Sequence, residues 1–146
     1  DRAEAAGVRL AVEPLNRFET SLFNTVAQTM ELIERVDHPS LGLLLDTFHM
    51  NIEERDPCAA IRLAGDRLFH FHACGNDRGA PGHDAIDWPA VRDALGDVNY
   101  LGAVSIESFT SANQTIATAA SIWRPLAPTQ DAIATQGLAF LRTLFG

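Results

Sequence analysis

The chain has 146 residues, of which 47% are hydrophobic and 21% are charged, so it holds enough apolar material for one folded domain and is not disordered. Its 11 basic and 19 acidic residues give a net charge of −8, which argues against a nucleic-acid or anionic-membrane partner. No apolar run approaches the roughly 20 residues that a membrane span needs. Two cysteines, Cys58 and Cys74, are too few for a disulfide framework and predict a reduced, cytoplasmic protein.

Four short apolar runs predict β-strands. Each run is continuous rather than alternating, which is typical of parallel strands covered by helices. The predicted strands are Val8–Glu13, Leu41–Asp46, Leu68–His72 and Ala103–Glu107.

A helix is predicted after each strand. Thr25 and Gln28 form a capping-box pattern at the start of a helix that carries Val26, Met30, Ile33 and Val36 at helical spacing. Asp56-Pro57 opens a second helix that ends at Gly65, and Asp87 opens a third that ends at Gly96. The last helix is predicted from about Thr129 to Phe145, after an irregular segment over Ser111–Pro128.

This alternation of strands and helices predicts a parallel α/β sheet with right-handed crossovers. Two architectures are consistent with it, a small doubly wound sheet and a section of a (β/α)₈ barrel. No glycine-rich loop follows any strand, which removes the main support for a nucleotide-binding sheet. A complete barrel needs about 250 residues, so four βα units in one domain over residues 1–146 would be half of one.

Each predicted strand ends in a side chain that can bind a metal: Glu13, Asp46, His72 and Glu107. Open α/β sheets and barrels place their active sites at the carboxyl ends of their strands. A single acid at a strand end is usually a helix cap or the start of a loop, but four out of four are harder to explain in this way. Three carboxylates and one imidazole suit Mn²⁺, Mg²⁺ or Co²⁺ better than structural zinc.

Three further polar residues follow the strand ends closely. Glu19, His49 and Arg78 lie within six residues of a strand end, on segments that can fold back over the site. They could contact a ligand, and Glu19 and Arg78 could equally be solvated loop charges. Trp123, in the irregular segment, is expected to pack against the domain rather than to bind substrate, although a tryptophan in a long loop near a barrel mouth could do both.

The motifs at the strand ends resemble those of the D-tagatose 3-epimerase family, which belongs to the xylose-isomerase-like sugar isomerase and epimerase barrels. The resemblance extends over essentially the whole chain, but only to the second half of such a barrel, strands five to eight. It rests on the segments Glu13-Pro-Leu-Asn-Arg-Phe-Glu19, Asp46-Thr-Phe-His-Met-Asn51, His70-Phe-His72, Asn76-Asp-Arg78, Asp87-Trp88 and Ile106-Glu-Ser-Phe109.

The resemblance implies a metal-dependent epimerase that inverts carbon 3 of a free ketose through an enediolate. Glu13, Asp46, His72 and Glu107 match the ligands of one divalent metal, usually Mn²⁺, with Mg²⁺ and Co²⁺ as alternatives. Glu13 and Glu107 also match the two acid/base carboxylates. Glu19, His49 and Arg78 match residues that hold the C1–C2 end of the sugar.

Other functions are consistent with the same residues. An isomerase of the same fold, of the hydroxypyruvate or inositol-pathway type, would differ in the position of proton transfer. A DNA-repair endonuclease of this fold would need more histidine ligands and a basic face. A non-catalytic half-barrel that binds a sugar or partner is a further alternative. A half-barrel would have two open sheet edges, so we expect either a missing N-terminal half or a homo-oligomer.

Overall fold

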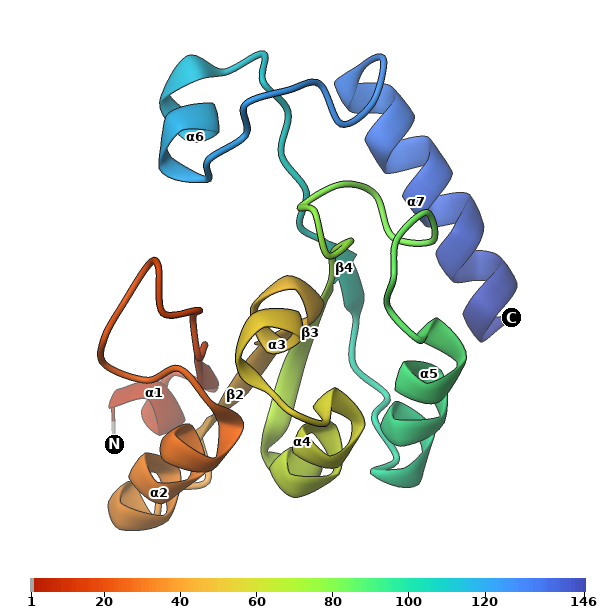
Figure 1. Ribbon diagram of the computed structural model, residues 1–146. Helices are drawn as coiled ribbons and strands as arrows, with labels where there is room; N and C mark the ends of the chain where they lie inside the picture. Colours follow the sequence, from red (N-terminus) through yellow and green to blue (C-terminus); the bar gives the residue numbers. More distant parts are fainter. Residues whose placement is uncertain (1) are drawn as a thin grey trace.

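The computed structural model describes residues 2–146 as one sheet of four parallel strands with helices packed against it (Figure 1). The strands lie in the order β1-β2-β3-β4, which confirms the predicted parallel α/β arrangement. Their bounds are β1 (Leu10–Val12), β2 (Leu41–Asp46), β3 (Leu68–Ala73) and β4 (Val104–Ile106).

The two outer strands are shorter than predicted. Glu13 and Glu107 lie one residue beyond β1 and β4, whereas Asp46 and His72 lie within the central strands. Each outer strand pairs with only one other strand of the described chain, so fewer backbone hydrogen bonds extend it. Val8, predicted as strand, lies before β1 and is 51% exposed.

The four predicted helices are present, and each begins at the predicted cap. The side chains of Thr25, Asp56, Asp87 and Thr129 each accept a hydrogen bond from a backbone N–H of the first helical turn. The helices are α1 (Arg2–Ala5), α2 (Val26–Val36), α3 (Thr47–Glu53), α4 (Pro57–Ala64), α5 (Trp88–Asp97), α6 (Gln114–Ala119) and α7 (Gln130–Phe145), with a 3₁₀ turn at Gly65–Arg67.

Helices α1, α3 and α6 were not among the predicted helices. Asp46 ends β2 and also caps α3, because its Oδ1 accepts a hydrogen bond of 2.7 Å from the backbone N–H of Phe48. Helix α6 lies inside the segment predicted to be irregular, where the Asn113 side chain caps it by accepting two backbone hydrogen bonds. The irregular prediction for Ser111–Pro128 is therefore wrong over Gln114–Ala119.

The hydrophobic core lies between the sheet and the helices. Leu43, Leu45 and Phe71 of the central strands pack with Ile33 of α2 and Ile61 of α4, all at 1% exposure or less. Helices α2, α4, α5 and α7 follow one another along the sheet, whereas α6 stands apart beyond the carboxyl end of β4 (Figure 1). None of the helices described for residues 2–146 is long and apolar enough to cross a membrane.

Candidate metal centre and adjoining cavity

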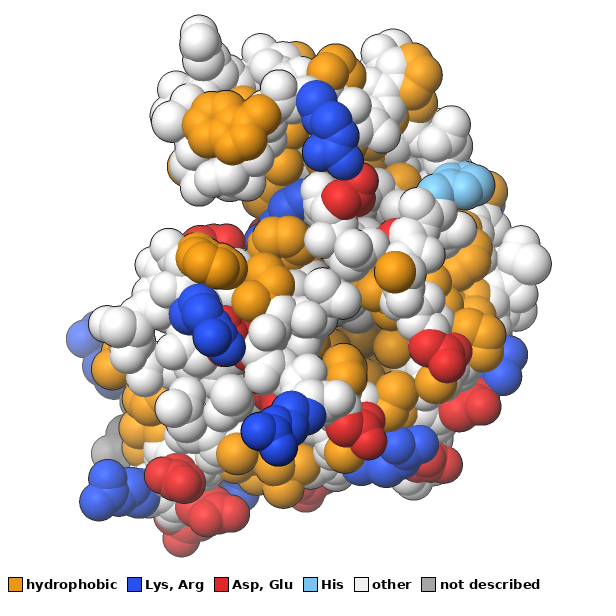
Figure 2. All heavy atoms as spheres, in the orientation of Figure 1, with side chains coloured by type: hydrophobic (Ala, Val, Ile, Leu, Met, Phe, Trp, Pro, Cys, Tyr) orange, Lys and Arg blue, Asp and Glu red, His pale blue; other side chains and the backbone are white. Residues whose placement is uncertain are grey.

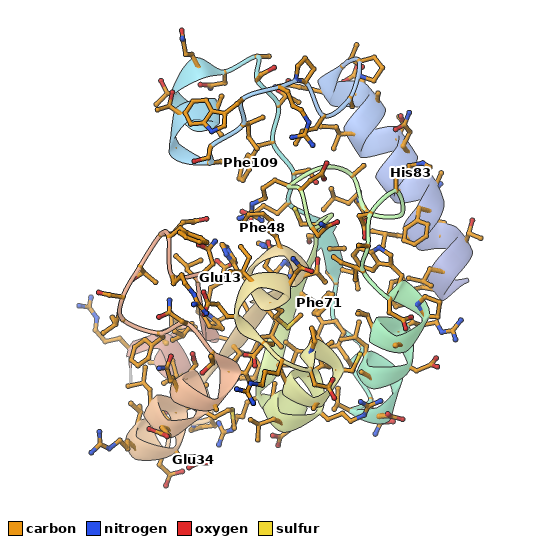
Figure 3. The ribbon with its side chains drawn as sticks, in the orientation of Figure 1. Glu13, Glu34, Phe48, Phe71, His83 and Phe109 are labelled. Carbon is orange, nitrogen blue, oxygen red and sulfur yellow. The ribbon has the colours of Figure 1, made fainter. Side chains whose placement is uncertain are left out.

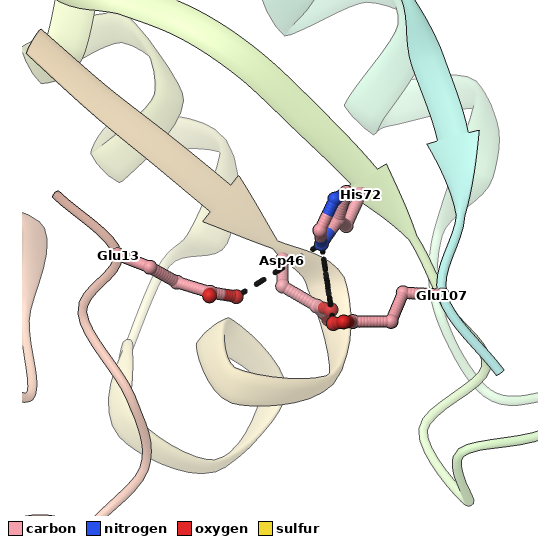
Figure 4. A group of neighbouring side chains, drawn as sticks. All are labelled: Glu13, Asp46, His72 and Glu107. Carbon is pink, nitrogen blue, oxygen red and sulfur yellow. Dashed lines mark hydrogen bonds and ion pairs between the residues drawn. The ribbon is translucent and has the colours of Figure 1, made fainter. Parts of the chain in front are cut away.

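The four residues predicted at the strand ends meet in space (Figure 4). Glu13 follows β1, Asp46 ends β2, His72 lies near the end of β3 and Glu107 follows β4. One ligand-type atom from each side chain lies within 4.8 Å of the other three. Because the strands are parallel, their carboxyl ends bring these side chains to the same edge of the sheet.

Asp46, which is buried, and His72, which is half-buried, form the centre of this cluster. His72 Nδ1 lies 3.1 Å from Glu107 Oε2 and 3.7 Å from Asp46 Oδ2. These two carboxylates raise the pKa of His72 from 6.5 to about 9. Burial alone would raise the pKa of Asp46, but its contacts with His72 and Arg78 outweigh burial and lower that pKa to about 2.

The environment of Glu13 acts on its pKa in the opposite direction to that of Asp46. Burial, followed by repulsion from Asp46 and Glu107, raises the pKa of Glu13 from 4.5 to about 7. Its Oε1 atom is buried, accepts no hydrogen bond from the described residues, and lies 3.8 Å from His49 Nε2. A buried carboxylate oxygen without a donor is costly, and a cation would satisfy it.

Arg78 supplies a fixed positive charge beside the cluster. Its Nη1 donates to Asp46 Oδ2 at 2.7 Å and lies 3.4 Å from Glu107 Oε2. The guanidinium lies between two aromatic rings, 4.4 Å from the ring centre of Phe48 and 5.1 Å from that of Phe109. Arg78 also has a left-handed backbone with φ of 69°, so the loop holds it in a conformation that non-glycine residues seldom adopt.

His49 belongs to α3, lies next to Arg78 and is almost fully buried. Burial lowers the pKa of His49, which favours the neutral ring. Its Nδ1 faces the loop after β1, where the backbone N–H of Asn16 donates to it at 3.2 Å. Asn16 in turn donates from its side chain to Glu19 Oε1 at 2.9 Å.

A cavity of about 350 Å³ adjoins the cluster. Glu19, His49 and Arg78, the three residues predicted to bind a ligand, line it together with Glu13 and Glu107. The structure therefore brings all seven predicted site residues to one place. On its far side the cavity is closed by Ile116, Ala119 and Ala120 at α6, and Figure 2 shows it as a notch below the lobe that α6 forms.

Several site residues were not assigned from the sequence. Phe48, Phe109 and Asn16 lie inside the recognised motifs, but only the fold shows their contacts with Arg78 and His49.

Trp123 is 76% exposed, so the prediction that it packs against the domain is wrong for the described chain. His83 is exposed and lies away from Glu13 (Figure 3).

The fold and the cluster place the chain in a known family. Residues 1–144 match the family model described as the xylose isomerase-like TIM barrel, and the chain belongs to this family. Within it, the chain is similar to the C-terminal half of ketose 3-epimerases, as the sequence motifs indicated.

Three relatives illustrate this similarity. A probable ketose 3-epimerase from Synechocystis sp. is 49% identical over 94% of this chain and 48% of its own length. A solved structure of L-ribulose 3-epimerase superposes with a TM-score of 0.92 at 40% identity, over 98% of this chain and 49% of that one. A D-psicose 3-epimerase crystallised in the presence of D-fructose also gives 0.92 at 39% identity, over 99% and 52%. The chain thus spans about half the length of these relatives.

Proposed function

We propose that the chain is the metal-binding half of a ketose 3-epimerase, which inverts carbon 3 of a free ketose through an enediolate. The observation that carries this proposal is the cluster of Glu13, Asp46, His72 and Glu107, whose ligand atoms lie within 4.8 Å of one another. Relatives named as ketose 3-epimerases, at 39–49% identity, support the reaction class.

The donor set fits one divalent cation. Three carboxylates and one imidazole nitrogen are ligands for Mn²⁺, and Mg²⁺ or Co²⁺ would bind the same set. With His72 neutral, the three carboxylates and the guanidinium of Arg78 sum to a charge of −2, which a divalent cation would balance. When bound, such a cation would polarise the C2 carbonyl of the ketose and make its C3 proton more acidic.

Glu13 and Glu107 are the proposed proton carriers. They approach the cluster from the two outer strands of the sheet, Glu13 from β1 and Glu107 from β4 (Figure 4). One carboxylate removes the C3 proton, and the electron pair of the C–H bond moves to form the enediolate. The other glutamate, which must carry a proton as a carboxylic acid when the ketose binds, delivers that proton to the opposite face of C3, which inverts that centre and leaves this side chain as the carboxylate.

The remaining cavity residues position the sugar. Arg78 is a hydrogen-bond donor beside the cluster and His49 lies next to it, and both would stabilise the negative charge that develops on the C2 oxygen. Glu19 would accept a hydrogen bond from a hydroxyl at the C1 end. The cavity of about 350 Å³ is large enough for a small-molecule ketose.

We also propose that the exposed edges of β1 and β4 pair with further strands, either those of an N-terminal half-barrel or those of a second copy. Leu10 on β1 is 54% exposed, which is typical of a strand that another element covers. The two free cysteines, Cys58 and Cys74, support a cytoplasmic location.

Solvent deuterium exchange into D-fructose and D-tagatose, followed by NMR in the presence of Mn²⁺, tests this function. We expect exchange at C3, and we expect Glu107→Gln to abolish it while leaving the circular dichroism spectrum unchanged. Glu34→Gln, on an exposed face of α2 far from the cluster (Figure 3), is the matched control and should exchange normally.

Two other results would replace the proposal. Exchange at C1 instead of C3 would identify a sugar isomerase. Binding of Mn²⁺ without exchange on either ketose would identify a metal-binding half-barrel that is not catalytic on its own.

A further inference from the structure

Arg78 belongs to a tight loop after β3, the segment Cys74–Gly79. Within this loop the backbone N–H of Gly75 donates to the oxygen of Gly79 at 2.9 Å, and the N–H of Arg78 donates to the oxygen of Gly75 at 2.9 Å. Arg78 has a φ of 69°, in the left-handed region that a residue with a Cβ seldom adopts. Such a conformation persists only where surrounding contacts hold it, so the loop needs external support.

The hydroxyl of Thr47 holds the beginning of the loop. The pairing of β2 with β3 ends at Asp46 and His72, because the chain turns into α3 after Asp46. Thr47 Oγ1 continues the pairing in place of a strand, since it accepts a hydrogen bond from the N–H of Cys74 at 2.8 Å and donates to the Cys74 oxygen at 2.5 Å. Thr47 is 3% exposed and Cys74 is fully buried, so water cannot replace these two bonds.

The segment after β4 holds the end of the same loop. Ser108 Oγ donates to the backbone oxygen of Gly79 at 2.8 Å. The backbone N–H of the next residue, Phe109, donates to the oxygen of Arg78 at 3.3 Å. The loop is therefore fastened at both ends, to α3 on one side and to the segment after β4 on the other.

The two hydroxyls stand next to the two carboxylates that Arg78 contacts. Thr47 directly follows Asp46 and Ser108 directly follows Glu107. Arg78 Nη1 lies 2.7 Å from Asp46 Oδ2 and 3.4 Å from Glu107 Oε2. Each hydroxyl thus fixes the loop against a segment that carries one of the carboxylates, which sets where the guanidinium lies between them.

We propose that Thr47 and Ser108 are positioning residues that hold the Cys74–Gly79 loop so that Arg78 lies between Asp46 and Glu107. The described lining of the cavity of about 350 Å³ includes Arg78 but neither hydroxyl, so both act on a bound sugar through Arg78. Their effect on catalysis rests on the proposed function, whereas their effect on the loop depends only on the contacts above.

Amide hydrogen exchange, followed by NMR on ¹⁵N-labelled protein, measures how firmly the loop is held. Thr47→Val keeps the shape of the side chain but removes both hydrogen bonds to Cys74. We expect it to accelerate exchange at the amides of Gly75 and Arg78 by about tenfold or more relative to the amides of α4, because a buried donor and acceptor lose their partner. Thr47→Ser keeps the hydroxyl and should leave this ratio unchanged.

Thr29→Val is the matched control. Thr29 is also fully buried, but its hydroxyl donates to the backbone oxygen of Thr25 within α2 at 3.1 Å. It should not alter exchange in the loop relative to α4. The role of Thr47 is overturned if Thr47→Val leaves the ratio unchanged, or if Thr29→Val raises it equally.

Ser108→Ala tests the other end of the loop and decides the question if Thr47→Val does not fold. It removes the 2.8 Å bond to Gly79 and should accelerate exchange at the amide of Arg78 relative to α4. An unchanged ratio in Ser108→Ala would overturn the role of Ser108, and with it the proposal that the loop is fastened at both ends.

Kinetics separate this proposal from the proposed function. If the protein epimerises ketoses, Thr47→Val should lower kcat by about 10- to 100-fold with a smaller change in KM, because Arg78 would no longer be placed to stabilise the developing negative charge. Thr47→Ser should restore kcat, and Thr29→Val should leave it unchanged. An unchanged kcat in Thr47→Val would overturn the positioning role. If the unaltered protein epimerises no ketose, the proposed function fails, and hydrogen exchange still decides whether Thr47 and Ser108 hold the loop.

Discussion

Replacement of Glu13 by glutamine should make the metal-free protein more stable at pH 8, even though Glu13 is a proposed catalytic residue. The Glu13 side chain is 25% exposed and lies beside Asp46 and Glu107, and its pKa is raised from 4.5 to about 7. A neutral glutamine of the same shape avoids both the burial of a charge and its repulsion by the two other carboxylates.

The size of the effect follows from the pKa. Each tenfold change in proton affinity corresponds to about 1.4 kcal/mol, so a rise from 4.5 to about 7 corresponds to about 3 kcal/mol. For an acid with a raised pKa, the folded state binds more protons than the unfolded state. The contribution of the protonated Glu13 side chain to the free energy of unfolding is therefore complete below pH 4.5 and is lost as the pH rises through 7. The glutamine side chain does not titrate, so the advantage of Glu13→Gln over the unaltered protein should grow across this window.

Urea unfolding at pH 4.5 and at pH 8, with a chelator present, measures this difference. We expect the free energy of unfolding of Glu13→Gln, relative to the unaltered protein, to increase by about 3 kcal/mol between the two pH values. Glu34→Gln on the exposed face of α2 should show no such trend. Equal pH dependence of the unaltered protein and Glu13→Gln would refute the argument that Glu13 is buried as a repelled charge.

Two further pairs of substitutions test charge pairing and backbone conformation in the fold. Arg78→Met should destabilise the protein by about 3–5 kcal/mol in urea at pH 7, because it leaves buried Asp46 without its 2.7 Å cation partner. Arg62→Met, which breaks an exposed 2.8 Å pair with Asp97, should cost less than about 1 kcal/mol, and equal losses would contradict the assignment. Gly82→Ala should lower the melting temperature, because Gly82 has a φ of +103° and an added Cβ would meet the Phe140 ring at 2.5 Å. Gly96→Ala, in α5 with open space around it, should raise the melting temperature, and a loss there would contradict this reasoning.

The grouping of the four side chains at the strand ends could be predicted from the sequence because parallel strands impose a simple rule. Residues that end neighbouring parallel strands lie at one edge of the sheet, so Glu13, Asp46, His72 and Glu107 could be grouped without knowledge of any side-chain conformation. The central strands were also predicted closely, since continuous apolar runs such as Leu41–Asp46 have one interpretation in an alternating β/α pattern.

The contacts between loops could not be predicted in this way. Asp46 both ends β2 and caps α3, and a sequence pattern does not show when one side chain has two structural roles. The stacking of Arg78 between Phe48 and Phe109 joins three separate segments, which local periodicity cannot bring together. The difference in pKa between Glu13 and Asp46 depends on which of the two carboxylates His72 and Arg78 hydrogen-bond, and those contacts exist only in the folded chain.

Metal uptake by this chain should release protons, and the number can be calculated from the cluster. At pH 7 Glu13, with a pKa of about 7, is about half protonated, and His72, with a pKa of about 9, is almost fully protonated. Both must lose their protons to become ligands, so binding of one Mn²⁺ should release about 1.5 protons at pH 7.

Isothermal titration calorimetry in two buffers of different ionisation enthalpy measures the number of protons released. Glu13→Gln should lower the number of protons released to about one, because glutamine has no proton to release while His72 still has one, and it should also weaken binding. Since all four side chains of the proposed site belong to this chain, this measurement does not depend on catalytic turnover. Binding without proton release at pH 7 would mean that the cation is held elsewhere, and absence of binding would mean that these four side chains do not form a metal site in this chain.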